Sequence, residues 1–282
     1  MSDPIRWGIL GAAKFAREYM GPAIHEAEGA VLSALATSSP DKAAAFQAFA
    51  PGLRIHDSYQ ALLDAPEIDA VYIPLPNAMH VDWTLKALAA GKHVLCEKPM
   101  TMAEAEFDSL IAARDASGKL AAEAYMIVHH PQWQRARELV QSGAIGTLRH
   151  VDGAFSFFNT DMSNIRNQAE TGGGALGDIG VYPFGATRFV TGAEPVSVKA
   201  RIDFENGVDT FSLVTAQFPD FTFSGMVSIR LALRQEIVFH GDKGVLRLTA
   251  PFNAGVFGEA MVHLRQGPQE RTERFTEARQ YT

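Results

Sequence analysis

Three side chains of this sequence have types that together could handle the proton of a substrate hydroxyl group: Lys98, Asp178 and Tyr182. Lys98 lies in HVLCEKPM, residues 93–100, directly behind a short apolar run. Pro99 restricts the backbone of Lys98 to extended conformations and prevents further sheet pairing. An ammonium positioned in this way can donate a hydrogen bond to a substrate oxygen while hydride is exchanged at the carbon.

The carboxylate and the phenol come from the glycine-rich segment GGGALGDIGVYPFG, residues 172–185. If Ala175–Tyr182 is helical, Asp178 and Tyr182 are four residues apart and share one face. They could then flank a sugar hydroxyl, with Tyr182 as proton donor or acceptor. A nearby ammonium favours the phenolate and lowers the phenol's pKa toward the working range.

Each of these segments also has a structural interpretation. The Glu97-Lys98 pair can be a surface loop, and the glycine-rich segment can be a hinged helix with Tyr182 half-buried and its hydroxyl satisfied. Pro183 complicates a continuous helix. The choice depends on the elements that position the three side chains.

The first 120 residues alternate short apolar runs with helical patterns, which predicts a parallel sheet covered on both faces. The predicted strands are Ile5–Leu10, Val31–Ala36, Arg54–His56, Ala70–Ile73, His93–Cys96 and Leu120–Ala124. The predicted helices are Phe15–Ala27, Pro40–Phe49, Ser58–Asp64, Val81–Ala90 and Met102–Ser117.

The pattern changes after Pro131. A helix is predicted at Gln132–Ser142, followed by the alternating segments HVDGAFSFF, VSVKARIDF, TFSLVTAQF, FTFSGMVSIRL, EIVFH and VLRLT. These predict a mainly antiparallel open sheet with one face toward a helix layer. The expected fold is α/β: a doubly wound parallel-sheet domain at residues 1–122, then an α+β domain for substrate binding and oligomerisation at residues 123–282.

The first strand–helix junction, GILGAAKFA, predicts a dinucleotide site. Gly11 permits a tight turn, and small Ala13 and Ala16 let the helix pack near the strand, so that its N-terminal amides can hold a pyrophosphate. A plain strand–helix turn is the alternative, because the strict G-x-G-x-x-G pattern is degraded here. The residues assigned to the cofactor from this junction are Gly8, Gly11, Ala12, Ala13, Lys14 and Phe15.

The end of the second strand bears on the choice between NAD and NADP. An Asp or Glu there prefers the free 2′-hydroxyl of NAD. This chain instead has Thr37 and Ser38, with Lys42 nearby, which predicts NADP with NAD still possible. No metal site is predicted.

Two further segments are expected at the carboxyl ends of parallel strands, where ligands bind in such sheets. IPLPNAMH, residues 73–80, contributes Pro74, Leu75, Asn77 and His80, although for His80 alone a structural role is favoured. The strand His93–Cys96 delivers Glu97 and Lys98 to the same edge.

Composition excludes several classes of function. The net charge is −7 without a Lys/Arg cluster, so nucleic-acid binding is not indicated. The single cysteine, Cys96, fits a reducing compartment. The N-terminus does not read as a signal peptide, and no apolar run of about 18 residues occurs. We expect a cytoplasmic protein without membrane or nucleic-acid partners.

In combination, these segments resemble the glucose-fructose oxidoreductase/inositol dehydrogenase/rhizopine-catabolism (Gfo/Idh/MocA) family. The matching motifs are GILGAAKFA, IPLPNAMH, the Glu97-Lys98-Pro99 tripeptide, EAYM at Glu123–Met126, HHPQ at His129–Gln132, and GGGALGDIGVY. The resemblance implies a Rossmann domain, an open antiparallel sheet domain, bound NAD(P), and oxidation or reduction at a sugar or polyol carbon. It also implies that Lys98 is catalytic, with Asp178 and Tyr182 beside it.

Tyrosine at position 182, where many members carry His, is similar to the branch with glucose-fructose oxidoreductase, aldose (xylose) dehydrogenases and dihydrodiol dehydrogenases. Tyr125 of EAYM and Arg166, with Asn164, are expected to contact substrate; a solvent-facing loop is the alternative for the latter two. The chain departs from the family at Val128, where many relatives have Arg, at Gly177, and at Thr282, beyond which the family generally continues into a helix.

The leading hypothesis is an NADP-preferring dehydrogenase or reductase of an aldose, polyol or cyclic diol, acting as a homodimer or homotetramer through the C-terminal sheet. A second hypothesis keeps the fold but assigns NAD-dependent glycoside hydrolysis through transient oxidation. A third is a non-enzymatic dinucleotide-binding regulator, against which the intact Lys98, Asp178 and Tyr182 argue.

Overall fold

Six parallel strands form the first sheet of the computed structural model, which describes residues 3–276 and 278–282. Their order is β3-β2-β1-β4-β5-β6, the order of a doubly wound dinucleotide-binding sheet. The strands are β1 (Ile5–Leu10), β2 (Ala30–Ala36), β3 (Arg54–His56), β4 (Ala70–Ile73), β5 (His93–Glu97) and β6 (Ala121–Ala124). The predicted parallel sheet is thereby confirmed.

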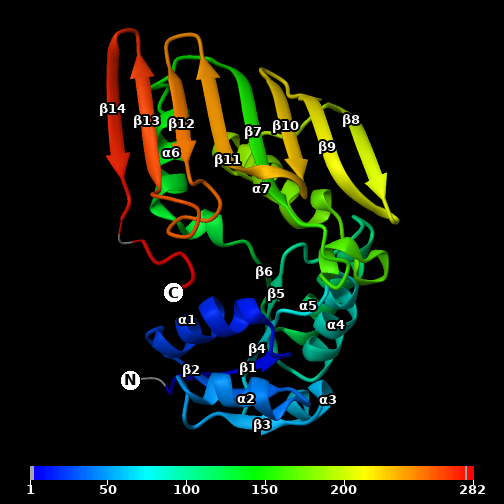
Figure 1. Ribbon diagram of the computed structural model, residues 1–282. Coiled ribbons are helices and arrows are strands. Elements are labelled where there is room, and N and C mark those ends of the chain that lie inside the picture. Colours follow the sequence, from blue (N-terminus) through cyan, green and yellow to red (C-terminus); the bar gives the residue numbers. More distant parts are fainter. Residues whose placement is uncertain (1–2, 277) are drawn as a thin grey trace. The chain divides into compact units, whose positions relative to one another are not determined.

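Helices pack on both faces of this sheet (Figure 1). They are η1 (Ala16–Met20), α1 (Gly21–Glu26), α2 (Pro40–Gln47), α3 (Tyr59–Leu63), η2 (Asn77–Met79), α4 (His80–Ala89) and α5 (Glu106–Ser117). Successive strand residues point to opposite faces, so Ile9 joins one apolar cluster with Phe46 while Leu10 joins another with Leu88. Two separate cores therefore enclose the sheet.

Eight strands form the second sheet, in the order β14-β13-β12-β11-β7-β10-β9-β8. All neighbours pair antiparallel except β10 and β7, which pair parallel. The strands are β7 (Leu148–Phe158), β8 (Ser197–Glu205), β9 (Val208–Gln217), β10 (Thr222–Ser228), β11 (Arg230–Gly241), β12 (Val245–Thr249), β13 (Met261–Gln266) and β14 (Gln269–Arg274). The prediction of a mainly antiparallel sheet is also confirmed.

One helix layer lies against this second sheet: α6 (Pro131–Gln141) meets β12 and β13, and α7 (Val181–Thr191) meets β7. Trp133 of α6 is fully buried, stacks on Phe252, and donates its indole N–H to the Pro251 carbonyl at 2.7 Å. The second unit also contains short helical turns: η3 (Met126–His129), η4 (Ile165–Asn167), η5 (Ala169–Thr171) and η6 (Leu176–Gly180).

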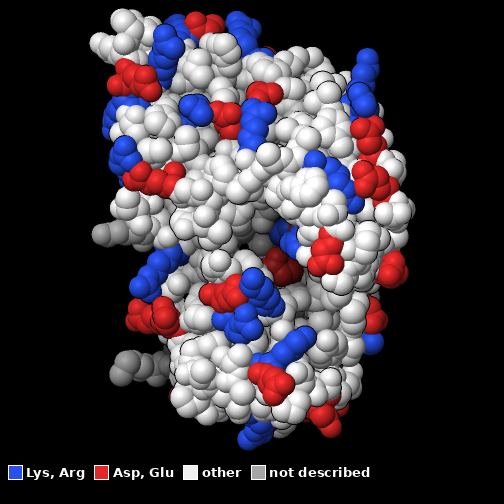
Figure 2. Space-filling view, in the orientation of Figure 1, with Lys and Arg blue, Asp and Glu red and all other residues white. Residues whose placement is uncertain are grey.

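The chain divides into two units, Met1–Tyr125 with Tyr281–Thr282, and Met126–Gln280. Within the described residues, no helix is both long enough and apolar enough to cross a membrane. On the face drawn in Figure 2, Lys and Arg side chains are interspersed with Asp and Glu.

Several element boundaries differ from the sequence predictions. The helix predicted from Met102 begins at Glu106, because the Glu106 carboxylate accepts the Met102 and Ala103 amides and folds those residues into a turn. The segment FTFSGMVSIRL is not one strand, since β10 ends at Ser228 and β11 begins at Arg230. Strands β13 and β14 were not predicted: the polar sequence of β14 lacks an apolar face, and the alternation in β13, with Val262 and Leu264 buried, is short.

Candidate functional site

The turn after β1 is built around Gly11. Its φ is +94°, a region that side-chain-bearing residues rarely adopt, and an added Cβ would meet Leu75 at 3.0 Å and Tyr59 Oη at 3.3 Å. The Gly11 amide donates to the Ala36 carbonyl at 3.0 Å, which ties this turn to the end of β2. Only glycine fits this turn without strain.

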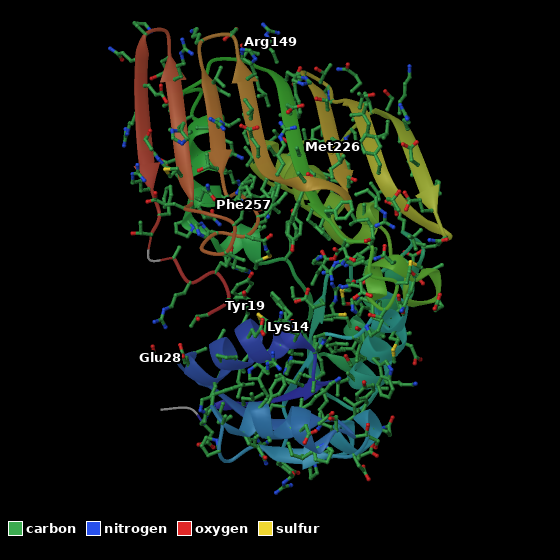
Figure 3. The ribbon with its side chains drawn as sticks, viewed as in Figure 1. Lys14, Tyr19, Glu28, Arg149, Met226 and Phe257 are labelled. Atoms are coloured by element: carbon green, nitrogen blue, oxygen red, sulfur yellow. The ribbon has the colours of Figure 1, made fainter. Side chains whose placement is uncertain are left out.

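Ala12 and Ala13 lead from this turn into a π-helical turn, η1, continued by α1. Lys14 projects at the start of this helix (Figure 3), with its side chain 79% exposed and its ammonium 4.0 Å from Glu18. Phe15 packs on Tyr19 and Tyr281, with ring centroids 5.2 and 5.5 Å away. π-turns are rare and occur often at functional sites.

Gly8 has a packing role of its own. A Cβ at this position would lie 2.6 Å from Leu62 Cδ2, so the missing side chain lets α3 approach β1. The glycine in the middle of the strand therefore follows from helix–sheet contact.

The end of β2 carries hydroxyl groups and no carboxylate between Ala36 and Pro40. The Ser39 amide donates to Thr37 Oγ1 at 3.2 Å, and Ser39 Oγ caps α2 by accepting the Lys42 amide at 3.4 Å. Ser38 follows the carboxyl end of β2 and Lys42 lies in the first turn of α2, the region that contacts the adenosine ribose in dinucleotide-binding sheets. The combination fits a 2′-phosphate, which needs donors and is repelled by carboxylates.

The segment after β4 contains Pro74, Leu75, Asn77 and His80. Leu75 is buried below Gly11, and Asn77 opens the turn η2. His80 is fully buried: its Nδ1 lies 2.7 Å from the Pro99 carbonyl oxygen and its Nε2 lies 2.8 Å from that of Leu75. Both ring nitrogens of His80 therefore contact backbone carbonyl groups of the protein.

Glu97 ends β5, and its carboxylate anchors the segment that carries Lys98. Oε1 accepts a hydrogen bond from the buried Tyr72 hydroxyl at 2.6 Å, and Oε2 accepts the Lys98 amide at 3.2 Å. Burial raises the pKa of the Glu97 carboxyl, while the Lys98 charge and the Tyr72 hydrogen bond oppose that rise. Burial, followed by the Glu97 charge, holds the pKa of Tyr72 well above its usual value.

The peptide after Lys98 is held as well. The Lys98–Pro99 bond is cis, and the Met100 amide donates to Glu123 Oε1 at 2.8 Å. Tyr72 and Glu123 were not among the predicted site residues. Tyr72 is the one aromatic residue of β4, and Glu123 belongs to the EAYM motif that also contains the predicted Tyr125. These two features of the sequence could have marked both residues as candidates for the site.

The residues of this first unit fit a dinucleotide. The strand order and the glycine-only turn at Gly11 fit a dinucleotide, and the carboxylate-free end of β2 fits one with a 2′-phosphate. Gly11, Thr37, Ser38 and Lys42 would hold its phosphates and adenosine ribose. Glu97 and Lys98 lie at the carboxyl end of β5, at the edge where ligands of such sheets bind.

In the second unit, the structure brings two predicted residues into contact. Arg166 Nε donates to Asp178 Oδ2 at 2.5 Å, and its Nη2 lies 3.4 Å from Oδ1. The Asp178 side chain is 12% exposed and that of Arg166 is 38% exposed. Asn164 caps the turn η4 by accepting the Arg166 amide at 3.1 Å. Asp178 is thus paired with a guanidinium of its own unit.

Asp178 and Tyr182 follow one another along a single helical run, from the π-turn η6 into α7. Pro183 does not break it: the run changes from the π-turn η6 to α7 at Val181, and Pro183 lies in the turn that follows this change. Asp209 of β9 anchors the start of this run: its Oδ2 accepts the Leu176 amide at 2.6 Å. Sequence reasoning missed Asp209, which lies 33 residues further along the chain.

Tyr182 is 6% exposed and belongs to an aromatic stack. Its ring centroid lies 5.6 Å from that of Phe155 and 5.4 Å from that of Phe252. Its hydroxyl donates to Met126 Sδ at 3.7 Å, a weak acceptor. The ring stack and this contact hold Tyr182 within the second unit.

Two family models match this chain: the oxidoreductase family with an NAD-binding Rossmann fold over residues 5–125, and the GFO/IDH/MocA C-terminal domain over residues 133–247. The chain belongs to the Gfo/Idh/MocA family of oxidoreductases. The resemblance seen in the sequence motifs is thereby confirmed. Together the two matches cover most of the chain.

Similar proteins include an oxidoreductase without an assigned activity, a named 3-reductase and a named 3-ketoreductase. An uncharacterised oxidoreductase of Rhizobium meliloti is 43% identical over 89% of this Gfo/Idh/MocA chain and 76% of its own length. A dTDP-3,4-didehydro-2,6-dideoxy-α-D-glucose 3-reductase of Actinomadura kijaniata is 33% identical over 97% of this chain and 82% of its own. The crystal structure of KijD10, a 3-ketoreductase of the same organism in complex with NADP and TDP-benzene, superposes with a TM-score of 0.91 at 30% identity, covering 99% of this chain and 86% of that one.

Proposed function

We propose that this protein is an NADP-preferring oxidoreductase that transfers hydride to or from a carbon of a sugar, or of a related polyol or cyclic diol. The observation that carries the proposal is the placement of Glu97, Lys98 and Pro99 at the carboxyl end of β5, within a sheet of dinucleotide-binding order. The 33%-identical relative named as a keto-sugar 3-reductase supports a sugar-ring carbon as the reacting centre.

The proposed roles follow from the chemistry of the side chains. Lys98 donates a hydrogen bond to the reacting oxygen. Tyr182 gives up or accepts the hydroxyl proton. Asp178, paired with Arg166, orients the substrate hydroxyl, with Tyr125 and Arg166 as further substrate contacts. NADP supplies or accepts the hydride at C4 of the nicotinamide.

The preference for NADP rests on the end of β2. Ser38 and Lys42 offer donors to a 2′-phosphate, and no carboxylate stands there to bind a free 2′-hydroxyl. The KijD10 structure contains NADP, and a D-xylose 1-dehydrogenase of Haloferax volcanii, 38% identical over 72% of this chain, is named for NADP(+). Both relatives support the same choice.

We further propose a homodimer or homotetramer formed through the second sheet. Apolar side chains are exposed on its strands, among them Leu213 on β9 and Leu233 on β11. Met226, labelled in Figure 3, lies on strand β10 of the same sheet. A cytoplasmic location is proposed because the single cysteine, Cys96, is buried and unbridged.

The decisive experiment follows reduced-nicotinamide absorbance with a panel of aldoses, polyols, cyclic diols and a dTDP-linked 3-keto sugar, each with NADP(H) and NAD(H). We expect sustained turnover with at least one substrate, faster with NADP(H). Lys98→Ala and Tyr182→Phe should each lower kcat about 10²–10⁴-fold.

Lys86→Ala is the matched control, because Lys86 is an exposed lysine of α4 that pairs with Asp82. It should keep wild-type turnover. A Lys98→Ala variant with near-full turnover and cofactor still bound would refute the assignment. Product release from a glycoside without net nicotinamide reduction would indicate the hydrolase chemistry instead.

A further inference from the structure

His80 occupies an unusual position between two backbone carbonyl groups. It is the first residue of α4 and is fully buried. Its Nδ1 lies 2.7 Å from the Pro99 oxygen and its Nε2 lies 2.8 Å from the Leu75 oxygen. The two carbonyls belong to different segments, one following β4 and the other following β5, so this single ring bridges both.

Carbonyl oxygens can only accept hydrogen bonds. A neutral imidazole has one N–H donor, and its other nitrogen carries a lone pair. A neutral His80 could therefore satisfy one carbonyl and would turn a lone pair toward the other at hydrogen-bond distance. An imidazolium donates from both nitrogens, so the cation is the state that matches this geometry.

A buried cation requires a compensating group. The two carbonyl oxygens supply acceptors for it, and the charge of His80 is also among the influences that lower the pKa of Glu97, against the larger effect of burial, which raises it. The Lys98 ammonium, the Tyr72 hydroxyl and the Lys98 amide lower the pKa of Glu97 as well. Of these groups, the Tyr72 hydroxyl and the Lys98 amide contact the Glu97 carboxylate directly at the end of β5.

The contact also lies next to Lys98. Pro99, whose carbonyl His80 holds, is the residue immediately after Lys98, and the amides on either side of Pro99 are held by Glu97 and Glu123. The two glutamates fix the segment against β5 and β6. His80 fixes it against the Leu75 segment, which packs beneath the Gly11 turn.

We propose that His80 is a positioning residue for the reaction: as an imidazolium donating through both ring nitrogens, it locks the Lys98–Pro99 segment to the Leu75 segment and so sets the place of the Lys98 ammonium. This inference rests on the proposed function, because it assigns to His80 the placement of the residue that donates to substrate. It replaces the cofactor contact expected for His80 with a role that acts through Lys98.

The first test compares His80→Gln with His150→Gln. Glutamine keeps one donor group and cannot bridge both carbonyls. Displacement of a reacting group by about 1 Å can cost about 10²-fold in rate, so His80→Gln should lower kcat about 10²-fold and leave the dissociation constant for NADP nearly unchanged. His150 lies on β7 of the second unit, where its ring nitrogens contact the hydroxyls of Thr222 and Ser224. Its variant should keep wild-type kcat. Unchanged kcat in His80→Gln would overturn the proposal.

The second test needs no turnover and uses the wild-type protein. Nitrogen-15 NMR of the histidine rings distinguishes an imidazolium, with two protonated nitrogens, from a neutral ring. We expect one buried ring with two slowly exchanging N–H groups near neutral pH, absent from the His80→Gln spectrum and present in that of His150→Gln. A neutral His80 ring would overturn the inference even if the enzyme is active. If no substrate of the panel is turned over, the proposed function fails by itself, and the ring state is still decided.

Discussion

Glu97 is the residue at which the hydrogen bonds around Lys98 meet. It receives one bond from a side chain, Tyr72, and one from the backbone of Lys98 itself. A buried carboxyl costs free energy unless its oxygens are satisfied, so each of these donors stabilises the fold as well as the site. The stability of the fold and the position of Lys98 therefore depend on the same hydrogen bonds to Glu97.

Tyr72→Phe tests this coupling. The substitution removes the donor to Glu97 Oε1 and keeps the ring, so it should lower the free energy of unfolding by about 1–3 kcal/mol, measured by urea denaturation. It should also raise the pKa of Glu97, because the Tyr72 hydrogen bond is one of the influences that lower it.

Tyr19→Phe is the control for Tyr72→Phe. Tyr19 is a partly exposed tyrosine of η1 whose ring packs on Phe15, and its variant should stay within about 0.5 kcal/mol of wild type. Equal stability of Tyr72→Phe and wild type would show that the bond to Glu97 contributes nothing.

Sequence reasoning identified Lys98, Asp178 and Tyr182 as candidates from residue type and spacing, and it could not identify their supports. Tyr72 lies 25 residues from Glu97, and Asp209 lies 33 residues from Leu176. Such contacts depend on which strands become neighbours, and periodicity does not encode strand order. The pairing of Asp178 with Arg166 was missed for a related reason, since both were assigned to the substrate rather than to each other.

At the scale of elements, the helical run from η6 into α7 is positioned by a close approach between two segments. Gly174 has φ +120°, and a Cβ there would lie 2.1 Å from Asp209 Oδ1, so the carboxylate fits only against a glycine. Burial raises the pKa of Asp209, while backbone amides, that of Leu176 first, oppose the rise. The glycine-rich motif therefore makes room for a cap contributed by β9.

Asp209→Ala should remove this cap. The Leu176 amide would lose its acceptor, lowering the free energy of unfolding by about 1–3 kcal/mol and lowering kcat, because Asp178 and Tyr182 lie in the same helical run. Denaturant unfolding and steady-state kinetics measure the two effects. Asp209→Asn should lose less, because its amide oxygen can still accept. If the alanine variant matches wild type in both assays, the cap does not position the run.

The elements themselves were largely predictable. Strands with continuous apolar runs, such as Ala70–Ile73, were found within a residue because both faces of that sheet are buried. The segments η1 and η6 are π-helical, but they were predicted as ordinary helix. A π-turn of five residues is too short to change the periodicity of apolar residues in the sequence. The Met102–Ala105 turn was missed because Glu106 competes for those amides through its side chain.

At the scale of the whole molecule, the chain consists of two units with separate sheets, and the features that fit a dinucleotide belong to the first. A ligand that binds only the native state stabilises it by mass action, by about 2.7 kcal/mol at 100 times its dissociation constant. Cofactor binding should therefore be visible as a shift in thermal unfolding, without any substrate.

NADP should raise the unfolding midpoint more than NAD at equal concentration, because Ser38 and Lys42 can contact the 2′-phosphate and no carboxylate ends β2. Differential scanning calorimetry measures this shift. Ser38→Asp places a carboxylate at that strand end; it should abolish the advantage of NADP through charge repulsion and favour NAD through its 2′-hydroxyl. Lys86→Ala is the control, since Lys86 is an exposed lysine of α4 outside the predicted cofactor site and its variant should leave the preference unchanged. Equal shifts by both cofactors in the wild type would mean that Ser38 and Lys42 do not contact the 2′ position of the adenosine ribose. An unchanged preference in Ser38→Asp would mean that this ribose binds elsewhere.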